Sequence, residues 1–248
     1  MSEQHEPWQH SACLDRRSFL SASFAITTLA FVGAGTLSGI AYADAMTKAQ
    51  REKLTPDDIL ALMKKGNKRF SSGQREDHNY LAQQRTSAAG QHPMAVLLSC
   101  IDSRAPAETI MDLRIGDIFN NRVAGNIANP DILGGMEFAC KLSGAKVILV
   151  MGHTACGAIK GAIDNAELGN LTGLLAKIKP AVAATAYAGD RSSKNYAFVD
   201  AVARKNVELT MENIRKDSPV LAGMESSGTI KIAGAMYNLQ TGVIDFFA

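Results

Sequence analysis

The sequence has little of what marks the more specialised classes of protein. Its 248 residues carry a formal net charge of only +2, which is too small to indicate binding to nucleic acid or to a lipid surface. It contains no internal repeat and no low-complexity tract, which argues against solenoid and fibrous architectures. These absences leave an ordinary globular domain, and the length is sufficient for one α/β core.

The first 43 residues are predicted to be a signal peptide and not part of the fold. Arg16 and Arg17 form a twin-arginine pattern, and a mildly apolar stretch rich in Ala, Gly, Ser and Thr follows over residues 21–40. We therefore expect export to the periplasm by the twin-arginine pathway, with cleavage after a small-x-small site near Ala43 or Ala45. The alternative is an uncleaved membrane anchor, but the Gly and Thr content makes this stretch a weak span. No stable anchor is expected after processing.

Residues 44–248 are predicted to form a single catalytic domain. The short apolar runs 94–99 and 146–151 favour buried strands, because they are rich in β-branched residues or leucine and bounded by Pro or Gly. Further strands are expected at 228–237 and 242–247, joined as a hairpin that adds an antiparallel edge. Helices are predicted at 134–141, 168–188 and 196–216, with a helical arm at about 46–73. The expected fold class is α/β, a mixed sheet with a parallel core flanked by helices.

Each of the first two strands is followed by residues that bind metals. The first strand leads into Cys100, with Asp102 and Arg104 close behind, and the second leads into His153 and Cys156. Open parallel sheets place their ligands at the carboxyl ends of strands, so these side chains are expected to share one crevice. Two thiolates and an imidazole select Zn²⁺, and three protein ligands leave the fourth position open, as in catalytic zinc sites.

The spacing Cys-x-Asp-x-Arg followed by His-x-x-Cys resembles that of the β-class carbonic anhydrases. The resemblance extends from the stretch 66–70 to residues 243–247. It implies one Zn²⁺ per subunit on Cys100, His153 and Cys156, and reversible hydration of CO₂ to bicarbonate through zinc-bound hydroxide. It further implies a homodimer or homotetramer in which the arm at about 46–73 packs on a neighbouring subunit.

The same resemblance assigns roles to five further residues. Asp102 and Arg104 are implied to be the catalytic pair beside the fourth zinc position, and Gln91, Phe119 and the Gly157 amide to bind the substrate. The chemistry is consistent with these roles, because a carboxylate can accept a hydrogen bond from the hydroxide and an arginine can hold that carboxylate with two hydrogen bonds. The sequence favours an open zinc site, in which water occupies the fourth position and Asp102 is bonded to Arg104. It also permits a closed site, in which Asp102 itself binds the zinc.

Three alternatives remain open. A CS₂ or COS hydrolase on the same scaffold would differ mainly in access to the pocket. A non-catalytic structural zinc site would need a fourth ligand, yet the remaining cysteine, Cys140, lies in an apolar segment typical of a helix packed on the sheet. A redox pair or disulfide between Cys100 and Cys156 is chemically possible after export, but it does not require Asp102, Arg104 and His153 at their spacings.

Overall fold

The computed structural model describes residues 45–247 of the chain. The predicted signal peptide, residues 1–43, lies outside the described residues. Within the described part, no helix has both the length and the apolar character needed to cross a membrane.

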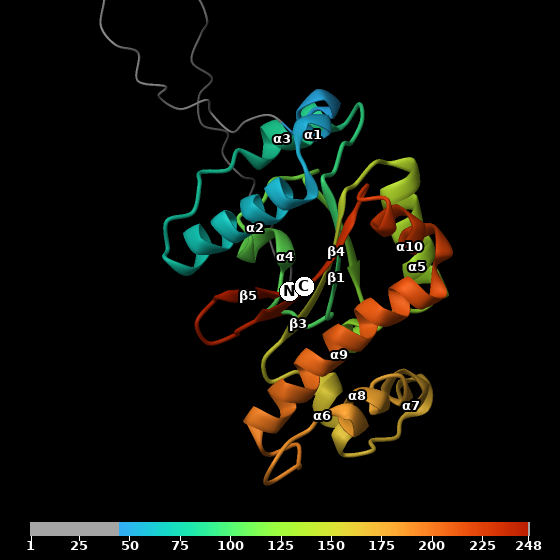
Figure 1. Ribbon diagram of the computed structural model, residues 1–248. Helices are drawn as coiled ribbons and strands as arrows, with labels where there is room; N and C mark the ends of the chain where they lie inside the picture. The colour runs from blue at the N-terminus through green and yellow to red at the C-terminus, as the bar shows by residue number, and fades with distance from the viewer. Residues whose placement is uncertain (1–44, 248) are drawn as a thin grey trace, which may run out of the picture. The chain divides into compact units, whose positions relative to one another are not determined.

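A five-stranded sheet forms the centre of the domain, in the order β2-β1-β3-β4-β5. The first four strands of this order run parallel to their neighbours, and β5 pairs antiparallel with β4 (Figure 1). The predicted parallel core, the antiparallel edge and the α/β fold class are thus confirmed. The strands are β1 (Ala95–Ser99), β2 (Ile118–Arg122), β3 (Val147–His153), β4 (Lys231–Tyr237) and β5 (Ile244–Phe247).

Helices cover both faces of this sheet and extend beyond its carboxyl end. In Figure 1, α2 and α4 lie on one side of the strands, whereas α5, α9 and α10 lie on the other. The helices are α1 (Lys48–Lys53), α2 (Pro56–Ser71), α3 (Tyr80–Ser87), α4 (Ala107–Ile110), α5 (Pro130–Glu137), α6 (Gly157–Ile163), α7 (Gly169–Ala176), α8 (Lys179–Ala184), α9 (Tyr196–Asp217) and α10 (Pro219–Ser226), with a short 3₁₀ turn η1 (Ala124–Asn126) and a π-helical turn η2 (Phe138–Leu142).

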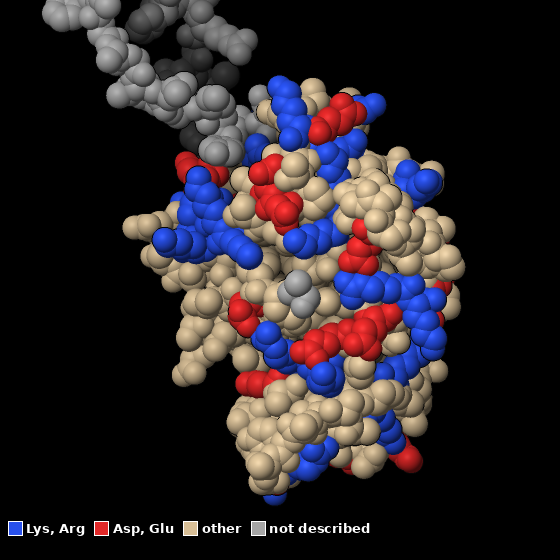
Figure 2. Space-filling view, in the orientation of Figure 1, with Lys and Arg blue, Asp and Glu red and all other residues tan. Residues whose placement is uncertain are grey.

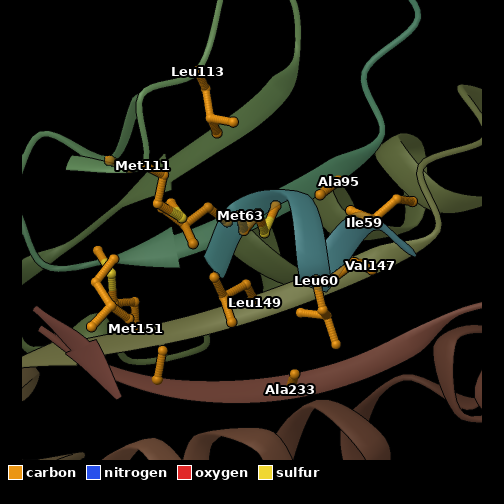
Figure 3. Packing of buried hydrophobic residues seen from close by; sticks show 14 of the residues in the cluster. Ile59, Leu60, Met63, Ala95, Met111, Leu113, Val147, Leu149, Met151 and Ala233 are labelled. Carbon is orange, nitrogen blue, oxygen red and sulfur yellow. The ribbon is translucent and has the colours of Figure 1, made fainter. Parts of the chain in front are cut away.

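The central strands are buried on both faces, so alternate residues enter two different cores. Ala95 and Leu97 of β1 join the cluster beneath α2 and α4, whereas Val96 and Leu98 join the cluster beneath α5 and α9. This alternation follows from the two-residue period of a strand. Figure 3 shows the first cluster, with Met63 of α2 lying over the strands. A third cluster, built by α6, α7, α8 and the start of α9, lies at the carboxyl ends of β1 and β3.

Helix α2 of the N-terminal arm packs on its own chain, and packing of the arm on a neighbouring subunit stays a prediction. Helix α2 begins at the predicted capping box, in which Thr55 and Asp58 bond reciprocally. It buries Ile59 and Met63 completely against the sheet. The Asn67 side chain then bonds to the Ile110 and Gly242 carbonyls and to the Ile244 N–H. The apolar face of α2 therefore belongs to the core of its own domain.

The region 168–188 differs from the single helix that was predicted. It forms two short helices, α7 and α8, because Pro180 lies in the first turn of α8 and has no N–H to continue a helix through this point. By contrast, the long helix predicted at 196–216 is present as α9. Acidic and basic side chains are interspersed on the surface around α9 (Figure 2). Arg204 of α9 forms an ion pair with Asp245 of β5 at 2.7 Å.

Candidate metal centre

The ends of two neighbouring strands bring together the three predicted metal ligands. Cys100 follows the last residue of β1, His153 ends β3, and Cys156 precedes the first residue of α6. Because Ser99 pairs with Met151 in parallel register, Cys100 and His153 emerge from the sheet at the same edge. All three residues are buried, and their ligand atoms lie within 4.8 Å of one another. Among the described residues, no other group of this kind is found.

The two sulfur atoms are spaced for a shared metal ion and not for a covalent bond. Cys100 Sγ and Cys156 Sγ lie 3.9 Å apart. A disulfide would need about 2.05 Å, whereas two Zn–S bonds of about 2.3 Å at a tetrahedral angle place the sulfurs about 3.8 Å apart. Both cysteines are free thiols in this structure. The separation therefore fits a tetrahedral zinc site.

His153 presents one ring nitrogen to the same space. Its Nδ1 lies 2.9 Å from the Thr154 carbonyl oxygen, which can only accept, so Nδ1 carries the proton. In the neutral ring Nε2 therefore carries the lone pair, and it is buried without a hydrogen-bond partner. An unpaired buried nitrogen is costly, and a metal ion beside the two sulfurs would satisfy it. A metal-binding histidine usually donates a hydrogen bond from its other ring nitrogen to a carbonyl or carboxylate oxygen, which fixes the orientation of the ring.

The surroundings of the sulfur atoms stabilise a thiolate. A hydrogen bond from the Cys156 thiol lowers the pKa of Cys100 to about 4, with contributions from His153 and the Gly125 N–H that outweigh the effect of burial. The hydrogen bond to Cys100, together with burial, raises the pKa of Cys156. Burial alone would lower the pKa of His153, but the interaction with the Cys100 sulfur outweighs this effect, and the pKa of His153 is raised. The thiolate is the form that binds metals.

Asp102 lies beside the ligands and is held by Arg104. The Arg104 Nε and Nη2 donate to the two carboxylate oxygens at 2.9 and 2.7 Å, and the Arg104 backbone N–H adds a third bond. The bonds from Arg104 hold the pKa of Asp102 well below its usual range. Asp102 Oδ2 lies 3.8 Å from His153 Nε2. In this structure the carboxylate is therefore ionised, next to the ligand atoms and bound to arginine.

Arg122 supports this segment from the neighbouring strand. It is the last residue of β2, and its guanidinium donates to the backbone carbonyls of Cys100 and Asp102. Arg122 is not among the site residues predicted from the sequence. Only the pairing of Arg122 with Ser99 across β1 and β2 places it next to Cys100.

The three residues predicted to bind substrate are not all near the metal ligands of their own chain. Gly157 directly follows Cys156, and the position of its absent side chain is open space. Phe119 of β2 pairs with Val96 of β1, which lies four residues before Cys100. At about 3.3 Å per residue, Phe119 is therefore displaced from Cys100 by about 13 Å along the strand direction. Gln91 is exposed and precedes β1, at the opposite end of that strand. Neither Gln91 nor Phe119 is therefore brought to the ligands within one chain.

Cys140 is core and not a fourth ligand. It lies in η2, buried in the cluster beneath α5 and α9, away from the cluster that contains Cys100 and Cys156. Burial raises the pKa of its thiol to about 12. The prediction that Cys140 packs against the sheet is confirmed. Among the described residues, the candidate metal group contains three ligands, and Cys140 is not one of them.

Comparison with known proteins assigns the family. A family model described as carbonic anhydrase matches residues 95–244. The chain is 32% identical over 182 residues to carbonic anhydrase 2 of Mycobacterium tuberculosis, across 73% of this chain and 87% of the relative. A tetrameric β-carbonic anhydrase of Sordaria macrospora matches with a TM-score of 0.59 at 27% identity, over 64% of this chain and 82% of that one. A β-carbonic anhydrase of Aspergillus fumigatus, CafA, matches with a TM-score of 0.58 at 27% identity, over 77% of this chain and 89% of that one. The metal-ligand geometry, the sheet topology and these similarities agree, and the chain belongs to the β-class carbonic anhydrases, a family of enzymes.

Proposed function

We propose that this chain hydrates CO₂ reversibly to bicarbonate and a proton, with one Zn²⁺ per subunit held by Cys100, His153 and Cys156. The observation that carries the proposal is the set of three ligand atoms. Two sulfurs lie 3.9 Å apart, and a buried, unpartnered imidazole nitrogen completes the set. Three ligands of this kind leave a fourth tetrahedral position for the reacting water, which distinguishes a catalytic zinc site from a structural one.

The residues around that position have separate tasks. When bound, zinc supplies a Lewis acid that makes water a nucleophile near neutral pH. The ionised Asp102 accepts a hydrogen bond from the attacking oxygen and thereby orients it. Arg104 keeps Asp102 ionised and holds both carboxylate oxygens, so that the carboxylate does not take the fourth position itself. The Gly157 amide, at the first residue of α6, is the proposed donor to the substrate oxygens.

We also propose that the active molecule is a homodimer or homotetramer. Gln91 and Phe119 are distant from the ligands of their own chain, so a second copy is needed to bring them to the substrate. Phe138 and Leu142 support the proposal, because their side chains are 49% and 76% exposed on this chain, and a second copy would cover them. The Sordaria macrospora relative is described as tetrameric.

Export is proposed from the sequence alone. The twin-arginine pattern at Arg16 and Arg17 and the small residues near Ala43 and Ala45 support cleavage and transfer to the periplasm. N-terminal sequencing of the protein recovered from its host tests this. A mature N-terminus at residue 44 or 46 supports export with cleavage, and recovery of Met1 contradicts it.

The activity is tested by stopped-flow CO₂ hydration with the purified protein from neutral to alkaline pH. Zinc is counted per subunit on the same sample. About one zinc per subunit, with activity that rises toward alkaline pH, is the expected result. One zinc without CO₂ turnover at any pH would contradict the proposal, and CS₂ and COS would then be assayed as substrates.

A further inference from the structure

The short turn between two of the metal ligands is fixed by contacts from outside it. The turn consists of His153, Thr154, Ala155 and Cys156. Thr154 is bonded to the end of β4 and the residues after it, since its N–H donates to the Tyr237 carbonyl and its Oγ1 accepts from the Leu239 N–H, both at 3.0 Å. These contacts fix Thr154 but do not set the conformation of Ala155, the next residue of the turn.

Ala155 has an unfavourable backbone conformation. Its φ is 55°, in the left-handed region that residues with a Cβ atom rarely adopt. Asparagine and aspartate tolerate this region better because their side chains bond locally, but alanine has no such group. Strained residues of this kind persist only where the surrounding structure holds them.

The contact that holds Ala155 comes from a helix far away in the sequence. The Ala155 N–H donates to Asp200 Oδ1 at 2.8 Å. Asp200 lies in the second turn of α9, a helix of 22 residues, beside Val199 and Val202, which are completely buried in the cluster that also contains Cys156. A carboxylate on a packed helix is a strong and rigidly placed acceptor.

We propose that Asp200 is a positioning residue for the metal centre. By holding Ala155 in the left-handed conformation, it fixes the offset between His153 Nε2 and Cys156 Sγ that a tetrahedral ion requires. If Ala155 relaxed to a negative φ, the chain would leave His153 in a different direction and carry the Cys156 sulfur out of place. The proposal rests on the zinc site proposed above and assigns to it a residue that touches neither the metal ligands' donor atoms nor the substrate.

The test compares zinc affinity in a small set of variants, measured by competition with a chelator. D200A is expected to bind zinc about 10- to 100-fold more weakly, the usual effect of losing a hydrogen bond that supports the metal ligands. D200N keeps an acceptor oxygen and is expected to bind nearly as well as the wild type. A155G in the D200A background is expected to recover most of the loss, because glycine adopts positive φ without a steric penalty.

Two further measurements separate positioning from general destabilisation. The absorption bands of the Co²⁺-substituted protein report the geometry of the ligand set, and they are expected to shift in D200A and to return in D200A/A155G. D217A removes a carboxylate from the other end of the same helix and is expected to leave zinc affinity and the Co²⁺ spectrum unchanged. A155V probes the turn without altering Asp200, and it is expected to weaken zinc binding because β-branched residues tolerate positive φ poorly.

Equal zinc affinities for the wild type and D200A would overturn the proposal. So would a loss in D200A that A155G leaves unrecovered, or full zinc affinity in A155V. If the wild type itself bound no zinc, the proposed function would fail first. A wild type that binds zinc and hydrates CO₂, with D200A unchanged, would refute only the role of Asp200.

Discussion

Asp102 and Arg104 are joined by two parallel hydrogen bonds although a single residue separates them in the chain. Such a close pair requires a sharp turn directly after Cys100, and the Arg104 backbone N–H stabilises that turn by donating to the same carboxylate. The pair is thus a local unit whose geometry is set within a few residues of a metal ligand. Its function can be tested separately from that of the ligands.

We expect D102N to lose most CO₂ hydration activity and to retain its zinc. An amide has the shape of the carboxylate but carries no charge and is a weaker hydrogen-bond acceptor, so the attacking oxygen would be poorly oriented and the loss should be about 10²-fold in kcat. Stopped-flow assays with zinc counted on the same sample measure both quantities. D245N, which alters a carboxylate 66% exposed on β5, is the control and should keep full activity. Activity in D102N close to that of the wild type would exclude Asp102 from catalysis.

Cys156 should be indispensable for the metal, whereas Cys140 should not. C156S replaces a thiolate ligand with a hydroxyl that binds zinc poorly, and we expect it to be isolated with much less than one zinc per subunit. C140A serves as the matched control, because Cys140 is equally buried but lies in the other core cluster. It should keep its zinc and lose some thermal stability. Full zinc occupancy in C156S would refute the ligand set.

Asp112 should make stability depend on pH in the acid range. Its side chain is fully buried and pairs with Arg69, Arg75 and His78. Burial acts to raise its pKa, but the bonds from Arg69, the Glu76 N–H and His78 outweigh it and lower the pKa to about 2. The pKa in the folded state is therefore below the unfolded value of about 3.9. The stabilisation is complete above about pH 4 and is lost as pH falls toward about 2.

Urea unfolding of D112N and the wild type tests this dependence. At pH 7 we expect D112N to be less stable by about 1–3 kcal/mol, and the difference should shrink between about pH 4 and pH 2. D57N is the control, since the Asp57 side chain is 80% exposed and its ion pair with Lys231 should contribute little. A difference between D112N and the wild type that stays constant down to pH 2 would contradict this role for Asp112.

The close contact of α2 with the loop after α4 should not tolerate a larger residue. A Cβ atom at Gly66 would lie 1.9 Å from the Met111 carbonyl oxygen, so G66A should lower the free energy of unfolding by about 1–3 kcal/mol. G223A is the matched change in α10, where a Cβ meets nothing within 4 Å, and should raise it by about 0.5–1 kcal/mol. Chemical denaturation measures both. Equal stabilities for the two variants would show that α2 can move away from Met111.

The elements predicted correctly are those with a strong local signal. The apolar runs before Cys100 and His153 became β1 and β3, and the capping box at Thr55 starts α2. Strand β2 was missed, because its residues are only partly buried and include two asparagines, a weak strand pattern. The packing of α2 on its own sheet was missed as well, because a sequence does not say which chain covers an apolar face.

The site was predictable as far as it depends on strand ends. Cys100 and His153 could be brought together because the carboxyl ends of adjacent parallel strands meet. The positions of Gln91 and Phe119 depend on the order and register of the strands, which cannot be read directly from the sequence. Asp200 had no signal at all, since a single acidic residue in a long helix usually faces solvent. Only the fold places it beside Ala155, 45 residues away.

The pairing of Ser99 with Met151 has a consequence for the way the chain folds. Side chains alternate along a strand, so a slip of β1 by one residue against β3 would turn Cys100 toward the opposite layer. Such a mispaired sheet would still bury apolar side chains on both faces, because both strands are buried throughout and most of their residues are apolar. It could not, however, assemble three metal ligands. Metal uptake would thus select molecules whose central strands are correctly aligned, and the bound ion would hold them in that state.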